Sequence, residues 1–243
     1  MCRSCGRRGP RVGGALRHAV ERGGRRARAR SSTESQTPGA DILAPMPPDL
    51  EPILALCWGE LAAAAADRRH GFHVGTLATV GPDGAPRARS LVLRAVDGAI
   101  GEIRSHTDLR SPKVAEVARA PRVAWHFYAP ERALQLRLLG SARVESEGAV
   151  TDLAWESSAL TSRRCYLAPA APGDACDAPS PNLPEEVRDR RPTEAEAAPG
   201  RVNFAILRTS VDAIDWLSLA SEGHRRASFR RIEGAWTGIW LEP

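Results

Sequence analysis

The feature that most constrains this chain is a series of short segments, alternating apolar and polar, that are separated by tight-turn sequences. The clearest turn is GPDGAP at 81–86, where the Asp83-Gly84 pair favours positive φ and a hairpin. Because such turns join neighbouring strands, the strands are expected to pair antiparallel. Similar turns are predicted at 96–98, 129–132 and 233–234.

The periodicity predicts about nine short strands and two or three helices, which indicates a mainly β fold with flanking helices, in the form of an antiparallel barrel. No glycine-rich loop joins a strand to a helix, so neither a dinucleotide-binding fold nor a P-loop is expected. The helices are expected at 49–68 (Asp49 as cap, Pro52 in the first turn), 109–118 (capped by Thr107 or Asp108) and 147–162. The strands are expected at 72–80, 87–95, 99–105, 123–128, 133–144, 202–208, 211–219, 226–232 and 236–241.

Residues 46–243 are expected to form one domain, because 42% hydrophobic content over 243 residues is enough for a core. Residues 1–45 are rich in Arg, Gly, Ser and Pro, and we expect them to be disordered. This leader also resembles an organelle transit peptide. A third interpretation, which we favour, takes Met46, followed by Pro47 and Pro48, as the true start behind an upstream extension.

The formal charge of +5 is unevenly distributed. Residues 1–45 combine ten arginines with three acidic residues, so the leader carries +7 and residues 46–243 about −2. No nucleic-acid partner is therefore expected for the folded domain, although a leader that binds nucleic acid stays open as an alternative. The longest apolar run, around Leu61, is too short for a bilayer, so neither a membrane-spanning helix nor a membrane partner is expected.

The cysteines favour a reducing, cytoplasmic location. There are five of them, an odd number, and their spacing matches no disulfide framework. Cys2 and Cys5 form one C-x-x-C pair, but a zinc site needs a second ligand pair at suitable spacing. No metal site is therefore expected.

The segment 168–200 is crowded with proline and charge. It is too long for an ordinary connection between elements, so it is either a functional lid or a mobile excursion. We favour the Pro-rich excursion.

The single lysine of the chain, Lys113, lies beside Thr107 and Ser111 at a predicted helix start, and Arg89 and Arg94 flank the apolar part of a preceding strand. Free backbone N–H groups, the positive end of the helix dipole, two hydroxyls and an ammonium together predict a phosphate site. The alternative is a set of solvated basic residues at strand ends.

Two further places carry candidate binding residues. Gln135 is a polar amide on a leucine-rich strand and could meet the edge of a heterocycle, or it could simply face water. Trp216, followed by His224 and Arg226, could hold a planar ligand by stacking and charge. The alternative places Trp216 in the core and the basic residues in a solvated hairpin.

Four motifs in order, namely RSLVLR, HTDLRSPK, LQLRLLG and DW...GHRR..F....W...WLEP, resemble the pyridoxamine 5'-phosphate oxidase-like (oxidase-related) family of FMN-binding split barrels over about residues 49–243. The resemblance implies an antiparallel split β-barrel, an FMN cofactor, and a homodimer with its site at the subunit interface. It implies that Gln135 meets the isoalloxazine edge and that Trp216 and Arg226 close the site from the partner subunit. The phosphate and ribityl chain would be held by Arg89, Arg94, Thr107, Ser111 and Lys113.

The chain departs from the oxidases at the substrate end. In those enzymes a tyrosine, an arginine and a serine, with a second arginine before a histidine, grip the substrate phosphate. The histidine is kept as the substrate-binding candidate His224, and the serine as Ser162. Three grip positions are changed, to Ala154, Ser158 and Glu222. Because Glu222 would repel a phosphate dianion, vitamin B6 phosphate is not the expected substrate.

The resemblance therefore predicts an FMN-dependent oxidoreductase that acts on an unidentified small molecule, with the flavin supplying the redox chemistry. The catalytic residues remain unknown. The alternatives are a non-catalytic flavin carrier or sensor, and a related barrel that binds haem or a deazaflavin.

Overall fold

The computed structural model describes residues 46–243. The leader 1–45, its Cys2-x-x-Cys5 pair and the sequence that precedes the proposed start at Met46 lie outside the described residues. Among the described residues, no helix is long and apolar enough to cross a membrane.

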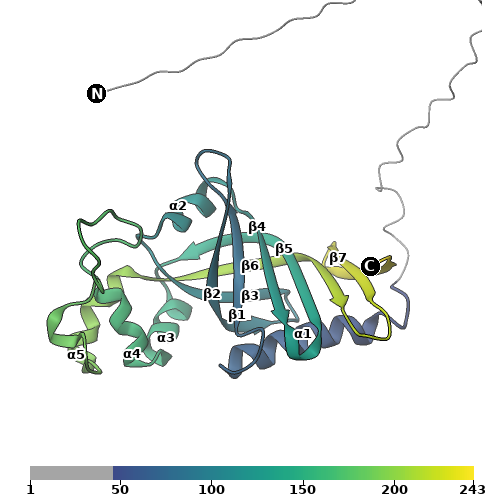
Figure 1. Ribbon diagram of the computed structural model, residues 1–243, viewed down its shortest axis with the longest axis horizontal. Coiled ribbons are helices and arrows are strands. Elements are labelled where there is room, and N and C mark those ends of the chain that lie inside the picture. The colour runs from purple at the N-terminus through teal and green to yellow at the C-terminus, as the bar shows by residue number, and fades with distance from the viewer. Residues whose placement is uncertain (1–45) are drawn as a thin grey trace, which may run out of the picture. The chain divides into compact units, whose positions relative to one another are not determined.

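Six strands form a closed antiparallel barrel (Figure 1). Their order around the barrel is β3-β2-β1-β4-β5-β6, and a further pairing of β3 with β6 closes it. Two more strands continue the sheet beyond β6 as a hairpin, so the fold is the predicted split barrel. The bounds are β1 (Val74–Val80), β2 (Pro86–Asp97), β3 (Glu102–Asp108), β4 (Arg122–Ala129), β5 (Leu134–Glu145), β6 (Phe204–Ser218), β7 (Arg225–Ile232) and β8 (Ala235–Leu241).

The long strand β6 belongs to both parts of this sheet. Its first half pairs with β3, from Phe204 to Ser210, and its second half pairs with β7, from Ala213 to Ser218. The sequence predicted two strands here, at 202–208 and 211–219, and this was wrong. The strand β5 pairs with both halves, and the register shifts where Leu139 pairs with Ala213 and Gly140 with Val211, which leaves Asp212 without a partner on β5. Residues 46–243 therefore form eight strands, and β6 is continuous.

The first hairpin turn was predicted correctly, with Gly84 at φ +81°, but the second lies later than expected. The strand β2 continues to Asp97, where its side-chain Oδ1 accepts hydrogen bonds from the backbone N–H groups of Ala99 and Ile100. The turn that follows ends at Gly101, which has φ +69°. The next strand therefore starts at Glu102 and not at 99.

Helix α1 (Glu51–Ala66) packs against β2. Its buried side includes Leu54, Cys57 and Leu61, at the three- and four-residue steps expected from the sequence. Pro52 lies in the first turn as predicted, but Asp49 does not cap the helix. The N-cap position is Leu50, and the Asp49 carboxylate instead accepts a hydrogen bond of 2.9 Å from the Trp240 indole.

Helix α2 (Pro112–Arg119) begins three residues later than predicted, with Ser111 at the N-cap. Neither Thr107 nor Asp108 caps it, because β3 extends through both residues. Asp108 is engaged by the backbone N–H and guanidinium of Arg110, at 2.7–3.0 Å. The helix start thus follows a short connection that fixes Ser111 beside the end of β3.

The helix predicted at 147–162 is interrupted. It forms α3 (Ala149–Ser157) and α4 (Leu160–Arg163), because Ser158 and Ala159 take extended ψ values of 135° and 139°. The connection back to β6 contains α5 (Glu194–Ala197), which has a capping box between Thr193 and Glu196. The remaining helical turns are the 3₁₀ segments η1 (Pro130–Arg132), η2 (Arg164–Leu167), η3 (Glu185–Val187) and η4 (Ala198–Asn203).

The core fills the barrel and the space beneath α1. On β5, Leu134, Leu136 and Leu138 are buried while Gln135 and Arg137 lie on the other face, as the alternation predicted. A second, smaller cluster under α3 consists of Trp155, Phe204 and Ile206. Two clusters of polar groups lie outside these cores, one at the start of α2 and one between β2 and α3.

Candidate functional site

The first cluster surrounds Lys113 at the start of α2. Its ammonium donates hydrogen bonds to Ser111 Oγ (2.5 Å) and to Thr107 Oγ1 (3.2 Å). Thr107 comes from the end of β3 and Ser111 from the N-cap of α2, so the strand-to-helix connection sets the geometry. Within residues 46–243, no carboxylate lies within ion-pair distance of this ammonium. We call Arg89, Thr107, Ser111 and Lys113 the Lys113 cluster.

The pKa of Lys113 is below its ordinary value. Burial is the main cause, and the nearby Arg89 guanidinium adds to it, while the more distant charges of Asp108 and Glu116 act in the opposite direction. A partly buried ammonium beside a guanidinium favours a bound anion, since an anion would stabilise both cations.

Arg89 reaches the same place through a buried ionic network. Its Nη2 lies 2.7 Å from Glu116 Oε2, which also accepts a hydrogen bond of 2.6 Å from Thr79 Oγ1. Arg87 Nη1 lies 3.3 Å from the other carboxylate oxygen. Burial alone would raise the pKa of Glu116, but the Thr79 hydroxyl and the two guanidiniums hold it below its ordinary value.

The donor set of the Lys113 cluster fits a phosphoryl group. Arg87, Arg89 and Lys113 lie near the buried carboxylate of Glu116, and Arg87 also lies 3.7 Å from the exposed carboxylate of Asp83, so three cations of this network meet two carboxylates and positive charge remains in excess. Hydroxyl and backbone donors at a helix N-terminus complete an arrangement that binds phosphate in many proteins. The structure thus brings four of the five predicted phosphate ligands together.

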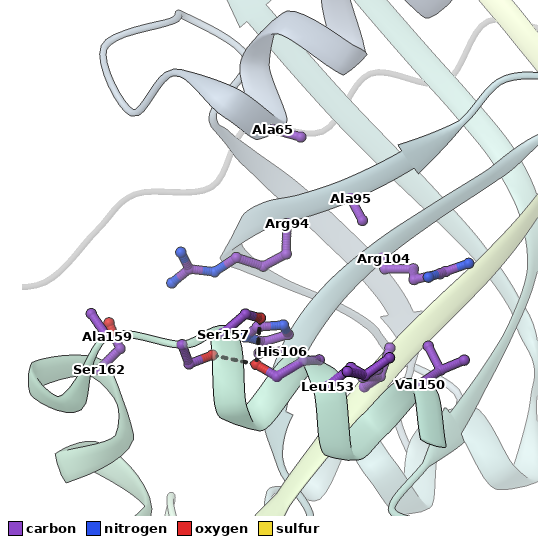
Figure 2. Close-up of a pocket in the computed structure, with 13 residues that line it drawn as sticks. Ala65, Arg94, Ala95, Arg104, His106, Val150, Leu153, Ser157, Ala159 and Ser162 are labelled. Atoms are coloured by element: carbon purple, nitrogen blue, oxygen red, sulfur yellow. Dashed lines mark hydrogen bonds between the residues drawn. The ribbon is translucent and has the colours of Figure 1, made fainter. Parts of the chain in front are cut away.

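The fifth predicted ligand, Arg94, lies elsewhere, on a cavity of about 740 Å³ between β2, β3 and α3. It occupies a register shift in β2, since Leu93 pairs with Ser105 and Ala95 with Arg104. Figure 2 shows its guanidinium extending toward the helices that carry Ser157 and Ser162. We call this space the Arg94 cavity; it is lined by Ala65, Arg94, Ala95, Arg104, His106, Val150, Leu153, Ala154, Ser157, Ser158, Ala159, Ser162 and Ile206.

The cavity has one polar end. His106 packs edge-on against Phe204 at 4.8 Å between ring centroids. Burial, assisted by the positive charge of Arg94, lowers the pKa of His106 to about 4, so the imidazole is neutral at pH 7. The hydroxyls of Ser158 and Ser157 both donate to the Ala154 carbonyl, at 2.7 and 3.3 Å.

Gln135 and Arg226 lie on a different surface, the outer face of the sheet formed by β4 to β7. Gln135 pairs with Leu217 across β5 and β6, and Leu217 pairs with Arg226 across β6 and β7, so the three side chains share one face. Gln135 Oε1 lies 3.1 Å from His126 Nε2, and Arg226 holds Asp215 at 2.8 Å.

Trp216 lies on the opposite face from Gln135 and Arg226. It pairs with Leu136 and Ala227, is 4% exposed, and belongs to the core. Its indole Nε1 is buried without a hydrogen-bond partner among the described residues, and the Arg225 guanidinium lies 5.9 Å from the ring centroid. A single copy of the chain therefore does not bring Trp216 together with Arg226.

His224 is exposed in the connection between β6 and β7. Its side chain makes no hydrogen bond to any residue of the described part of the chain. Its assignment to substrate binding stays a prediction.

Sequence reasoning missed Thr79, Glu116 and His106. Thr79 and Glu116 are 37 residues apart, and only the packing of α2 on β1 brings them together. His106 stands in the motif that contains Thr107, but its neutral state depends on burial that a sequence does not reveal.

Comparison with known proteins shows which proteins this chain is similar to. Residues 56–146 match the family model of the pyridoxamine 5'-phosphate oxidase FMN-binding domain. A pyridoxine/pyridoxamine 5'-phosphate oxidase 2 of Arabidopsis thaliana is 26% identical over 203 residues, which are 76% of this chain and 96% of the relative. A pyridoxine/pyridoxamine 5'-phosphate oxidase of Hyphomonas neptunium is also 26% identical, over 82% of this chain and 90% of the relative.

Two solved structures share the fold. One is a pyridoxamine 5'-phosphate oxidase-related, FMN-binding protein of Nostoc punctiforme, with a TM-score of 0.60 and 24% identity over 76% of this chain and 96% of that one. The other is PhzG of Burkholderia lata, determined with tetrahydrophenazine-1-carboxylic acid, with a TM-score of 0.58 and 20% identity over 84% of this chain and 98% of that one. The chain thus shares the split-barrel fold of these structures, and its residues 56–146 are similar to the FMN-binding domain of the pyridoxamine 5'-phosphate oxidases.

Proposed function

We propose that the chain is an FMN-dependent oxidoreductase whose substrate site differs from that of the pyridoxamine 5'-phosphate oxidases. The observation that carries the cofactor assignment is the Lys113 ammonium, which is bonded to two hydroxyls and has no carboxylate partner within residues 46–243. An FMN phosphate would supply the missing anion. The matched family model, described as an FMN-binding domain, supports the same cofactor.

Under this proposal, the Lys113 cluster holds the phosphate end of the flavin. Arg89 and Lys113 supply charge, and Thr107 and Ser111 supply hydroxyls. Glu116 fixes the direction of the Arg89 guanidinium, because their ion pair is short and the carboxylate is buried. The bound flavin would supply hydride or electron transfer, and the protein would orient it.

The Arg94 cavity is the proposed substrate end. Its lining includes Ala154, Ser158 and Ser162, three of the positions that correspond to the phosphate grip of the oxidases. Two of these three have lost the aromatic or charged group expected there, and Glu222 is a third loss. We infer that the substrate is not vitamin B6 phosphate.

We also propose that the working form is a homodimer with its sites at the interface, because one copy holds the two ends of the predicted flavin site far apart. Thr107 pairs with Ala205 near the start of β6, whereas Gln135 pairs with Leu217 near its end. At about 3.3 Å per residue, this separation along β6 reaches roughly 40 Å. Figure 1 shows β6 as one long strand from the region of α3 to that of β7. A mononucleotide flavin is much shorter, so Gln135 and Arg226 would reach it from a second copy.

Mixing two variants tests the shared site. Lys113→Ala and Arg226→Ala homodimers should each bind FMN weakly. After subunit exchange, about a quarter of the sites should regain the affinity of the unmodified protein, because mixed dimers carry one intact and one doubly altered site. A protein that sediments as a monomer, or a mixture that regains no sites, would contradict the dimer proposal.

The visible spectrum of purified protein tests the cofactor itself. We expect a flavin spectrum, FMN release on denaturation, and tighter binding of FMN than of riboflavin, which lacks the phosphate. A haem or deazaflavin spectrum would refute the assignment. A flavoprotein that stays oxidised with every donor offered would leave FMN in place but exclude an oxidoreductase, in favour of a carrier or sensor.

We propose a cytoplasmic location because the cysteines of the described residues are not joined in disulfide bonds. Cys57, Cys165 and Cys176 are free thiols in the described part of the chain, and burial raises the pKa of the Cys57 thiol to about 12. Free thiols suit a reducing compartment. Recovery of the protein in a secreted or organellar fraction would contradict this location.

A further inference from the structure

We infer that the Arg94 cavity takes a small molecule with an apolar body and a single carboxylate, and that Arg94 binds this carboxylate. The inference deepens the proposed function, since it assigns a substrate class to the same site. It also gives Arg94 to the substrate, whereas the sequence assigned it to the FMN phosphate.

The size and lining of the cavity suit such a molecule. A volume of about 740 Å³ falls within the range of small-ligand sites. Much of the wall is apolar, with Val150, Leu153 and Ile206 along one side. The polar groups gather toward Arg94 and His106, so a ligand with one charged end and an apolar remainder would match both parts.

Arg94 is the available cation of this cavity. The other arginine in the lining, Arg104, is held by Glu102 at 2.6 Å, and Figure 2 shows it extending away from Arg94. Arg94 is exposed at the cavity and makes no ion pair with any carboxylate of residues 46–243. A planar guanidinium without a partner presents two parallel N–H groups, the geometry that a carboxylate accepts.

The remaining donors favour a carboxylate over a phosphate. The hydroxyl groups of Ser157 and Ser158 already donate hydrogen bonds to the Ala154 carbonyl, so in this arrangement they can accept a hydrogen bond from a ligand but not donate one. Neutral His106 offers one ring N–H and no charge. A single guanidinium balances one negative charge, so a phosphate dianion would keep an unbalanced charge in a largely apolar space.

The test uses three probes on the FMN-loaded protein, namely benzoate, benzamide and phenyl phosphate, with binding measured by calorimetry. Benzoate should bind at least about tenfold more tightly than benzamide, as expected for a charge-assisted contact. Phenyl phosphate should bind less tightly than benzoate. In Arg94→Ala the preference of benzoate over benzamide should disappear, in Arg94→Lys it should be partly kept, and the exposed control Arg122→Ala should keep it fully.

Several results would overturn the inference. They are equal binding of benzoate and benzamide, tighter binding of phenyl phosphate, or a preference that survives in Arg94→Ala. A loss of FMN affinity in Arg94→Ala as large as in Lys113→Ala would return Arg94 to the cofactor. Failure of the unmodified protein to bind FMN would instead refute the proposed function, and titration of the protein as purified would still report on the cavity.

Discussion

The Lys113 cluster and the Arg94 cavity both present cations beside hydroxyls, but they differ in how much charge they offer and how firmly it is held. In the Lys113 cluster, Lys113 donates hydrogen bonds to two hydroxyls, and a second cation, Arg89, is fixed by the buried carboxylate of Glu116. In the Arg94 cavity, the guanidinium of Arg94 lies near a neutral imidazole, and the second arginine of the lining, Arg104, is paired with Glu102. The first arrangement suits a dianion and the second a monoanion.

The difference follows from the elements that carry each site. The Lys113 cluster lies where a strand passes into a helix, so backbone N–H groups and the helix dipole add to the side chains. The Arg94 cavity lies on the side of the barrel, where Arg94 and Ala95 at a register shift of β2 line the same space as residues of α3. Under the proposed function, the cofactor site and the substrate site rest on different segments, so changes at one need not alter the other.

The largest expected effect concerns Lys113→Ala. Removing the ammonium should weaken FMN binding by about 1.5–3 kcal/mol, the range for a charge-assisted hydrogen bond, which is roughly 10- to 150-fold. Riboflavin binding should stay nearly unchanged, because riboflavin has no phosphate. Fluorescence titration of both flavins measures the ratio. An equal loss for both flavins would show that the variant disturbs the fold and not a phosphate contact.

The next effect concerns the carboxylate that balances the cluster. Glu116→Gln should lower the free energy of unfolding at pH 7 by about 1–2 kcal/mol, because Thr79 and the two guanidiniums lose an ionised acceptor. The folded state holds the pKa of Glu116 below its ordinary value of 4.5. Its contribution is therefore complete above about pH 4.5 and is lost as the pH falls through the lower folded value.

Urea unfolding from pH 7 down to pH 3 measures this effect. The unmodified protein should lose stability through the acid range more steeply than Glu116→Gln does. The matched control is Asp212→Asn, since Asp212 forms an exposed ion pair with Arg122. Parallel acid profiles for the unmodified protein and Glu116→Gln would contradict the ionic network.

Local sequence signals predicted most of the barrel strands, because several turns contain residues that favour a particular backbone conformation. The 81–86 turn places Gly84 at positive φ, and the alternation on β5 correctly separated Leu136 from Gln135. Closure of the barrel could not be predicted from local sequence signals. It depends on the pairing of β3 with β6, for example Glu102 with Ser210, which brings together residues more than one hundred positions apart.

The candidate site residues likewise include some that local sequence predicted and others that it did not. Lys113, Thr107 and Ser111 are near neighbours in sequence, so their association could be predicted from spacing. Arg94 was grouped with Arg89, although the two are five residues apart and strand alternation sets residues an odd number apart on opposite faces, as the burial pattern of β2 shows. The separation of Trp216 from Arg226 depends on the register of the β6–β7 hairpin. This register pairs Trp216 with Ala227 and thereby sets Arg226 on the other face of the sheet.

A smaller effect is expected at the segment 168–200, which the sequence presented as either a lid or an excursion. Buried Arg163 ties it to the cavity wall, with Nη1 at 2.5 Å from Glu194 and Nε at 3.0 Å from the Ser158 carbonyl. Arg163→Ala should lower the free energy of unfolding by about 1–2 kcal/mol and raise hydrogen exchange in 168–200. Benzoate binding should weaken because the same contact positions Ser158.

FMN affinity should not change in Arg163→Ala, since no bond links Arg163 to the Lys113 cluster among the described residues. Arg190→Ala is the matched control, because it removes a partly exposed ion pair with Glu196 in the same segment. Unaltered exchange in Arg163→Ala, or an equal change in the control, would show that the Arg163 contacts do not hold this segment in place.

The smallest effect separates the two sites by their response to pH. His106 has a pKa of about 4, lowered by burial and by Arg94, so it stays neutral between pH 6 and 8. Benzoate binding should change by less than about twofold across this range, whereas a histidine of ordinary pKa would gain charge and strengthen anion binding as the pH falls through about 6.5. Calorimetric titration at several pH values, with His106→Gln as the control, measures how benzoate affinity changes with pH.

Because a phosphate loses its second charge near pH 6, FMN binding should weaken below this pH while benzoate binding does not. Strengthening of benzoate binding near pH 6.5 that disappears in His106→Gln would mean that the imidazole carries charge at the anion site, and the distinction between a one-charge cavity and a multi-charge cluster would be lost.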